Sequence, residues 1–167
     1  MINCSVFTPR RSFGANTYIL ESDGEYCVID PSVSYFEVSE RLGDIRGAVK
    51  YIFVTHCHFD HILTLDEWVE ITGVYPTMSQ KATENIKKSK INCYRLFSGE
   101  DRAYLGPAYA VKNNDELAFS SSRIRFICTE GHTDCSFSIL ADSFLFVGDT
   151  LFSHGSYGRY DLPTGDA

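Results

Sequence analysis

Short apolar runs separated by amphipathic segments set the pattern of hydrophobic and polar positions along the chain. Residues 49–54 are rich in β-branched and aromatic side chains, as expected of a buried strand. Residues 123–129 alternate polar and apolar side chains like a half-buried strand, and residues 143–147 form another apolar strand candidate. Helical spacing predicts three helices between the strand-like runs, at residues 35–42, 65–71 and 80–88. This order favours alternating α and β layers.

A cluster of histidines directly follows the first of these predicted strands. Three of the five histidines lie in the run Thr55-His56-Cys57-His58-Phe59-Asp60-His61. His56 and His58 are two residues apart, so in extended chain they point to the same side. Imidazole and carboxylate groups are usual ligands of zinc and similar divalent ions. The run therefore predicts a metal-binding loop at the carboxyl end of a strand, where ligands gather in open α/β sheets.

Two later strand ends carry the same kinds of side chain. His132 follows the predicted strand at residues 123–129, and Asp149 follows the one at residues 143–147, directly after Gly148. Three strand ends can together supply one site for two metal ions, which lie about 3.5 to 4 Å apart in enzymes that use such pairs.

Four ordered motifs span much of the chain. An expected opening hairpin at residues 16–20 and 28–31 precedes them. The motifs are T-H-x-H-x-D-H at residues 55–61, G-H-T at 131–133, G-D-T-L-F at 148–152 and G-R-x-D at 158–161. In these motifs the chain resembles the metallo-β-lactamase superfamily and, within it, the glyoxalase II-like (hydroxyacylglutathione hydrolase-like) hydrolases. The resemblance implies an α/β fold, the αββα sandwich of two mixed sheets with helices outside, with residues 1–167 as a single domain.

The resemblance also implies a set of metal ligands. His56, His58 and His132 would bind the first metal, while Asp60, His61 and Asp149 would serve the second, with Asp149 bridging both. The implied cofactors are two divalent metal ions, Zn²⁺ or alternatively Fe or Mn. The implied reaction is cleavage of a small-molecule thioester or ester by a metal-bound hydroxide, and Asp60 is the catalytic residue expected to handle protons.

One ligand of the family pattern has no counterpart in the sequence. Members usually carry a further histidine in a Gly-His motif beyond G-R-x-D, but the sequence ends at Ala167. Residues 162–167 have turn and N-cap chemistry suited to starting a helix. We therefore expect a domain that lacks its C-terminal elements and exposes apolar surface on one face of the second sheet. His154 is expected to be a solvent-facing loop residue.

Two other functions stay open at this point. One is a mononuclear iron oxygenase resembling the persulfide dioxygenases of the same superfamily, with iron held by His56, His132 and Asp149. The other is a noncatalytic, degenerate metal-binding domain, which would hold one ion at most and show no turnover.

Composition and charge limit the classes of binding partner that we expect. A net charge of −7 disfavours nonspecific binding to nucleic acid. The sequence has no apolar run long enough to span a membrane and no basic start with a long apolar run as in a secretion signal, so we expect a cytoplasmic protein that binds neither nucleic acid nor membrane.

Several residues near the motifs have ordinary structural interpretations. The six cysteines lack the dense spacing of a secreted disulfide scaffold, so free thiols are expected, with Cys57 in a packing role. Asp30 precedes Pro31, which favours a turn over a contact with a ligand histidine. Arg159 is expected to form an ordinary ion pair rather than a substrate contact.

Overall fold

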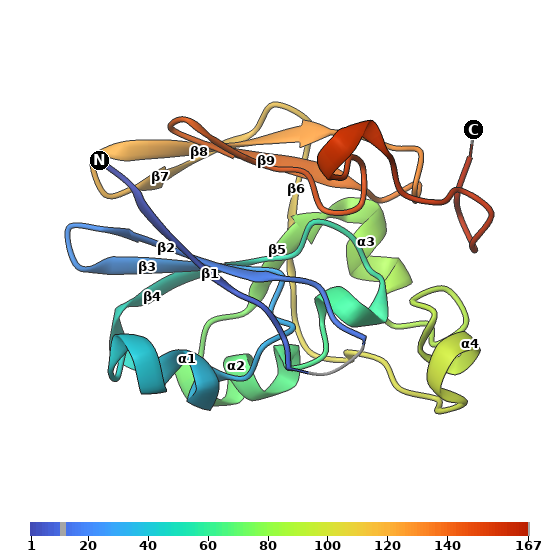
Figure 1. Ribbon diagram of the computed structural model, residues 1–167, viewed down its shortest axis with the longest axis horizontal. Helices are drawn as coiled ribbons and strands as arrows, with labels where there is room; N and C mark the ends of the chain where they lie inside the picture. The colour runs from blue at the N-terminus through green and yellow to red at the C-terminus, as the bar shows by residue number, and fades with distance from the viewer. Residues whose placement is uncertain (11–12, 167) are drawn as a thin grey trace.

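Two β-sheets lie face to face in the computed structural model, which describes residues 1–10 and 13–166 (Figure 1). The six-stranded sheet has the order β1-β2-β3-β4-β5-β6, and its strands are Asn3–Phe7, Thr17–Ser22, Glu25–Ile29, Val49–Phe53, Pro76–Ser79 and Tyr109–Val111. The four-stranded sheet has the order β10-β9-β8-β7, and β7 to β10 are Glu116–Phe119, Ser122–Cys128, Phe137–Ala141 and Phe144–Phe146.

The described residues also form four α-helices and three short 3₁₀ helices. The α-helices α1 to α4 are Tyr35–Leu42, Leu65–Thr72, Gln80–Asn85 and Tyr94–Ser98. The 3₁₀ helices η1 to η3 are Arg46–Ala48, Phe59–His61 and Ser153–Gly155. Within the described residues, no helix is both long and apolar enough to cross a membrane.

Strand direction places the candidate ligands at one edge of the six-stranded sheet. Strands β1, β2 and β3 pair antiparallel, whereas β3, β4, β5 and β6 pair parallel. The carboxyl ends of β3 and β4 therefore lie side by side, and Ile29 pairs with Phe53. The segment with Asp30 and the one with the histidine cluster start at these two ends, so they leave the sheet next to each other.

The hydrophobic core has two large parts, one on each face of the six-stranded sheet, and a small third cluster of Phe59, Cys93 and Tyr94. Between the sheets, the ring of Phe53 on β4 packs edge to face on Phe126 of β8, with centroids 5.1 Å apart. On the other face, Trp68 of α2 is fully buried and its indole N–H donates to the carbonyl oxygen of Val33. The central strands are thus covered on both faces, which explains the continuous apolar run of β4.

The predicted elements are largely confirmed, with differences at their ends. The predicted strands correspond to β4, β8 and β10, and the expected opening hairpin is formed by β2 and β3. Helix α1 has the predicted bounds, α2 extends to Thr72, and α3 ends at Asn85 rather than at residue 88.

The sandwich fold is confirmed, but two details of the prediction need correction. The four-stranded sheet is antiparallel throughout rather than mixed, because its strands follow one another through short reversals. Helices α1 and α2 lie outside the six-stranded sheet, whereas no described α-helix covers the outer side of the four-stranded sheet (Figure 1). Leu145 on its edge strand β10 is 53% exposed. Residues 162–166 contain a turn, and Ala167 lies outside the described residues.

Candidate metal centre

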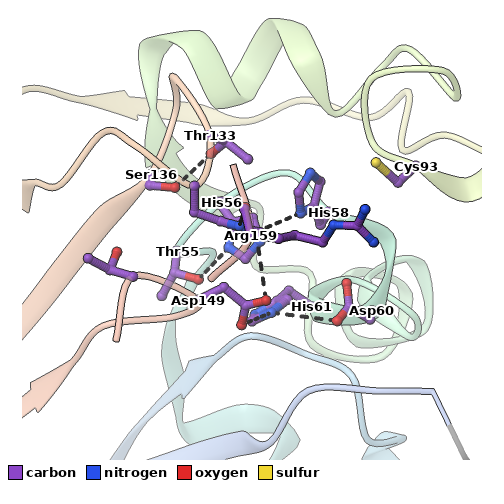
Figure 2. Close-up of polar contacts among 12 residues, drawn as sticks. Thr55, His56, His58, Asp60, His61, Cys93, Thr133, Ser136, Asp149 and Arg159 are labelled. Atoms are coloured by element: carbon purple, nitrogen blue, oxygen red, sulfur yellow. Dashed lines mark hydrogen bonds and ion pairs between the residues drawn. The ribbon is translucent and has the colours of Figure 1, made fainter. Parts of the chain in front are cut away.

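Four histidines converge at the ends of the two sheets. His56 and His58 follow β4, His61 ends the 3₁₀ turn η2, and His132 lies in the loop between β8 and β9. All four are buried, with exposed fractions between 1% and 7%. Figure 2 shows His56, His58 and His61 close together, with Asp149 of the segment after β10 beside them. The ring centroid of His132 lies 4.9 Å from that of His56 and 4.7 Å from that of His58. The structure thus brings together side chains that are far apart in sequence.

The nitrogen and oxygen atoms form two overlapping groups with the spacing of metal ligands. One group is His56, His58 and His132, the other is His56, His61 and Asp149, and the ligand atoms within each lie within 4.8 Å of one another. His58 Nδ1 lies 2.9 Å from His132 Nε2. The carboxylate of Asp149 lies 3.1 Å from His61 Nε2 and 3.7 Å from His132 Nε2. Asp149 is therefore positioned between the groups.

The chemistry of these residues fits a divalent cation. His56 Nε2 is buried and has no hydrogen-bond partner among the described residues. A buried polar atom without a partner is costly, and a coordinated cation removes that cost. Imidazole and carboxylate ligands suit zinc, iron and manganese.

Burial keeps two of the histidines in the neutral form that ligation requires. Burial and the neighbouring imidazoles lower the pKa of His56 well below its usual value, and lower the pKa of His58 to about 3. The pKa of His61 behaves differently: burial acts to lower it, but the carboxylates of Asp30, Asp60 and Asp149 together raise it well above its usual value. The three carboxylates of the site thus lie close to His61.

Asp30 contacts a candidate ligand histidine, the alternative that its sequence favoured less than a turn. Its carboxylate is buried, accepts hydrogen bonds of 2.8 Å from the backbone N–H and the hydroxyl of Thr55, and lies 2.8 Å from His61 Nδ1. The contact fixes the His61 ring so that Nε2 faces Asp149. The favoured interpretation, a turn, is also present, since Ser32 N–H donates to Asp30 O, but it was incomplete. A signal existed: Asp30 follows the strand that precedes the histidine strand.

The segment after β10 orients His132. The Nδ1 atom of His132 lies 2.6 Å from the backbone carbonyl oxygen of Arg159, so it carries the proton and leaves Nε2 free for a ligand. The Arg159 guanidinium forms a two-pronged ion pair with Asp161, at 2.6 and 2.7 Å, so the predicted ion pair is confirmed. The contribution of the Arg159 carbonyl has no sequence signal, because any residue supplies a carbonyl.

Asp60 lies at the edge of the cluster rather than inside it. Its carboxylate is 3.8 Å from His61 Nε2, and its side chain is 31% exposed. It belongs to neither ligand group. The iron set expected for an oxygenase, His56, His132 and Asp149, does not form a single group either, because its members are divided between the two.

The remaining predictions for individual residues near the motifs hold. His154 is exposed. Cys57 is fully buried in the core, as a packing role requires, and all six cysteines are free thiols.

A cavity of about 500 Å³ opens directly onto the ligand atoms. Its walls include the candidate ligands His58, Asp60, His132 and Asp149. Cys93 also lines it, and burial raises the pKa of this thiol to about 11, so the thiol is neutral. Figure 2 shows Cys93 and Arg159 on the same side of the histidine cluster as Asp60. The candidate metal ligands are thus accessible to a small molecule.

Residues 10–167 match the family model described as the metallo-beta-lactamase superfamily. The chain belongs to this superfamily, whose members bind divalent metals, and both the predicted superfamily and the predicted fold class are confirmed.

Individual relatives show how far the likeness extends. The chain is 33% identical over 163 residues to a probable metallo-hydrolase of Methanocaldococcus jannaschii, covering 92% of this chain and 75% of that protein. It is 29% identical over 139 residues to a hydroxyacylglutathione hydrolase of Buchnera aphidicola subsp. Schizaphis graminum, covering 83% of this chain and 48% of that one. The crystal structure of the B3 metallo-beta-lactamase BLEG-1 superposes with a TM-score of 0.86 at 26% identity, covering 99% of this chain and 79% of that chain.

Proposed function

We propose that this chain is a metal-dependent hydrolase that cleaves a thioester or ester. The observation that carries the proposal is the pair of ligand groups sharing His56, of which His58, His132 and Asp149 lie on the wall of an open cavity. The G-R-x-D motif at residues 158–161 and the hydroxyacylglutathione hydrolase among the relatives support the thioester.

We divide the six candidate ligands into two sets, one for each metal ion. We assign His56, His58 and His132 to one ion, and His61, Asp149 and Asp60 to a second, with Asp149 between them. The donor set suits zinc, with iron or manganese as alternatives. Bound divalent ions lower the pKa of a coordinated water toward about 7 and polarise a substrate carbonyl.

Proton handling falls to Asp60 in this proposal. Its carboxylate lies on the cavity wall, 3.8 Å from His61 Nε2, and its partial exposure allows exchange with solvent while it also serves as a ligand. A proton accepted there can be delivered to the leaving thiol or alcohol.

The test combines metal analysis with substrate kinetics. Purified protein loaded with zinc is expected to hold two ions per chain, as measured by inductively coupled plasma mass spectrometry. It is also expected to hydrolyse a glutathione thioester or a p-nitrophenyl ester. His56→Ala is expected to lower kcat/KM by at least about 100-fold, the upper range seen when even an outer partner of a ligand is lost. His154→Asn, at an exposed histidine outside the site, serves as the matched control and should leave kcat/KM unchanged.

Three other outcomes would contradict the proposal. Cleavage of a chromogenic β-lactam, without cleavage of the thioester or the p-nitrophenyl ester, would indicate a β-lactamase. One iron per chain with oxygen uptake in the presence of glutathione persulfide would indicate the oxygenase. A single bound ion with no turnover of any substrate would indicate a noncatalytic domain.

A further inference from the structure

Three exposed phenylalanines line the cavity beside the candidate metal centre. Phe13 comes from the segment between β1 and β2, Phe97 from α4, and Phe152 from the segment after β10. Their exposed fractions are 69%, 49% and 44%. Single exposed apolar side chains are ordinary, but three from separate segments around one cavity mark a binding surface.

The aromatic surface continues inward to the metal-binding loop. Phe59 lies between His58 and Asp60 in sequence, lines the same cavity and is buried. Its ring stacks on Phe97, with centroids 5.5 Å apart and an interplanar angle of 22°. Leu162, in the segment after β10, packs against the cluster formed by Phe59, Cys93 and Tyr94. The apolar wall therefore runs from the exposed rim to the loop that carries the ligands.

Apart from bound metal ions, the charges around the cavity offer little attraction to an anionic group. Among the described residues that line the cavity, Arg159 is the only Arg or Lys side chain, and its guanidinium is already paired with Asp161 through two hydrogen bonds. The carboxylates of Asp60 and Asp149 lie on the same walls. Away from the ligand atoms, an uncharged, apolar group is better matched to these walls than a carboxylate or phosphate.

We propose that the substrate cleaved at this site carries an aromatic acyl group, which binds along Phe59, Phe97 and Phe152. This inference rests on the proposed function. A cavity of about 500 Å³ is within the range of small-molecule sites, and offset or edge-to-face contacts with the phenylalanine rings favour an aromatic ring over a plain methyl group.

The reaction balances as an ordinary hydrolysis. The oxygen of water forms a new bond to the acyl carbon, and the carbon–sulfur bond breaks with its electron pair going to sulfur. One proton of water goes to the thiol, and the aromatic acid leaves as the second product.

The first experiment compares two thioesters of N-acetylcysteamine that differ only in the acyl group, phenylacetyl and acetyl. The wild-type protein with zinc is expected to have at least a tenfold higher kcat/KM for the phenylacetyl thioester. Phe97→Ala and Phe152→Ala should each reduce this preference at least threefold. Phe36→Ala is the matched control, because Phe36 is 65% exposed on α1 and does not line the cavity. Equal kcat/KM values for the two thioesters, or a preference that survives in both cavity variants, would overturn the inference.

A binding measurement separates this inference from the proposed function. If neither thioester is hydrolysed, the proposed function fails, and calorimetry with phenylacetate and acetate on the zinc-loaded protein still tests the cavity. Because both ligands carry the same carboxylate, the ratio of their Kd values reports the aromatic ring. A Kd at least tenfold lower for phenylacetate, with the difference reduced in Phe97→Ala and retained in Phe36→Ala, supports the aromatic surface. Equal Kd values would refute it.

Discussion

Gly158 allows the last loop to approach the candidate metal centre closely. A Cβ atom at this position would lie 2.0 Å from the backbone oxygen of Asp149 and 2.8 Å from His132 Nδ1. Distances this short cannot be accommodated without moving the backbone or the imidazole ring. The absence of a side chain at Gly158 therefore lets the Arg159 carbonyl reach His132.

We predict that Gly158→Ala weakens metal binding. The added methyl group displaces the loop or the His132 ring, so the hydrogen bond that orients His132 is lost, and such outer contacts are typically worth about 10- to 100-fold in metal affinity or activity. The measurement is a competitive zinc titration against a chromogenic chelator. Gly47→Ala is the control, because a Cβ there meets nothing within 4 Å. Equal zinc affinity in the two variants would show that the close approach of Gly158 is unimportant.

Helix α1 illustrates how local sequence determines where an element begins. Ser34 has an extended backbone conformation, and its hydroxyl accepts a hydrogen bond from the backbone N–H of Glu37 at 3.2 Å. The next residue links this helix to α2, because Tyr35 N–H donates to the carboxylate of Glu67. The Ser34 cap therefore fixes the start of α1, and the hydrogen bond from Tyr35 to Glu67 holds that start beside α2.

Ser34→Ala should lower the free energy of unfolding by about 1 kcal/mol, the usual cost of losing a serine N-cap. Urea unfolding followed by circular dichroism measures the change. Ser39→Ala in the same helix is the comparison: its hydroxyl bonds back to the Phe36 carbonyl, and alanine is the better helix former in a helix interior. A loss of stability in Ser39→Ala equal to that in Ser34→Ala would mean that the cap contributes nothing specific.

Elements with a strong local pattern were predictable from sequence, and those that depend on tertiary contacts were not. Helix α1 has clear helical periodicity and strand β4 has a clear apolar run, and their predicted positions agree with the structure. Helix α4 has only five residues and follows Cys93 in a left-handed conformation, so no local signal announces it. The direction of β9 relative to β8 is likewise absent from hydrophobic alternation, which is the same for parallel and antiparallel neighbours.

In the candidate site, too, the features set by local sequence were predictable and those set by tertiary contacts were not. The ligands of the histidine run were predictable because they lie in one short motif whose residue types are those of metal sites. The contact of Asp30 with His61 spans 31 positions in the chain, and the stacking of Phe59 on Phe97 depends on the placement of α4. Such contacts exist only once the sheets and helices have packed.

The candidate ligands connect the two halves of the sandwich. His56, His58 and His61 follow β4 of the six-stranded sheet, whereas His132 and Asp149 belong to segments joined to the four-stranded sheet. A cation coordinated by both sets joins the sheets at one end of the molecule. Metal binding should therefore stabilise the native packing as a unit.

Removal of metal is expected to lower Tm. At a free zinc concentration about 100 times Kd, binding contributes about 2.7 kcal/mol, and for a chain of this size each kcal/mol corresponds to about 2–4 °C, so a shift of roughly 5–11 °C is expected. Differential scanning calorimetry with zinc and after dialysis against a chelator measures it. His154→Asn should retain the shift and His56→Ala should lose most of it. An identical Tm with and without zinc in the wild-type protein would contradict the proposed linkage.

The distance between the ligands along the chain also bears on how the protein is made. His61 and Asp149 are 88 positions apart, and a ribosome that adds about 5–20 residues per second needs roughly 4–18 s to synthesise the chain between them. During that interval the nascent protein presents an unfinished cluster of imidazoles to the cell. On the proposed ligand set, the ligands of the first ion are complete once His132 has been translated, whereas those of the second ion are complete only after Asp149 has emerged. The nascent chain can therefore bind one metal ion before it can bind two.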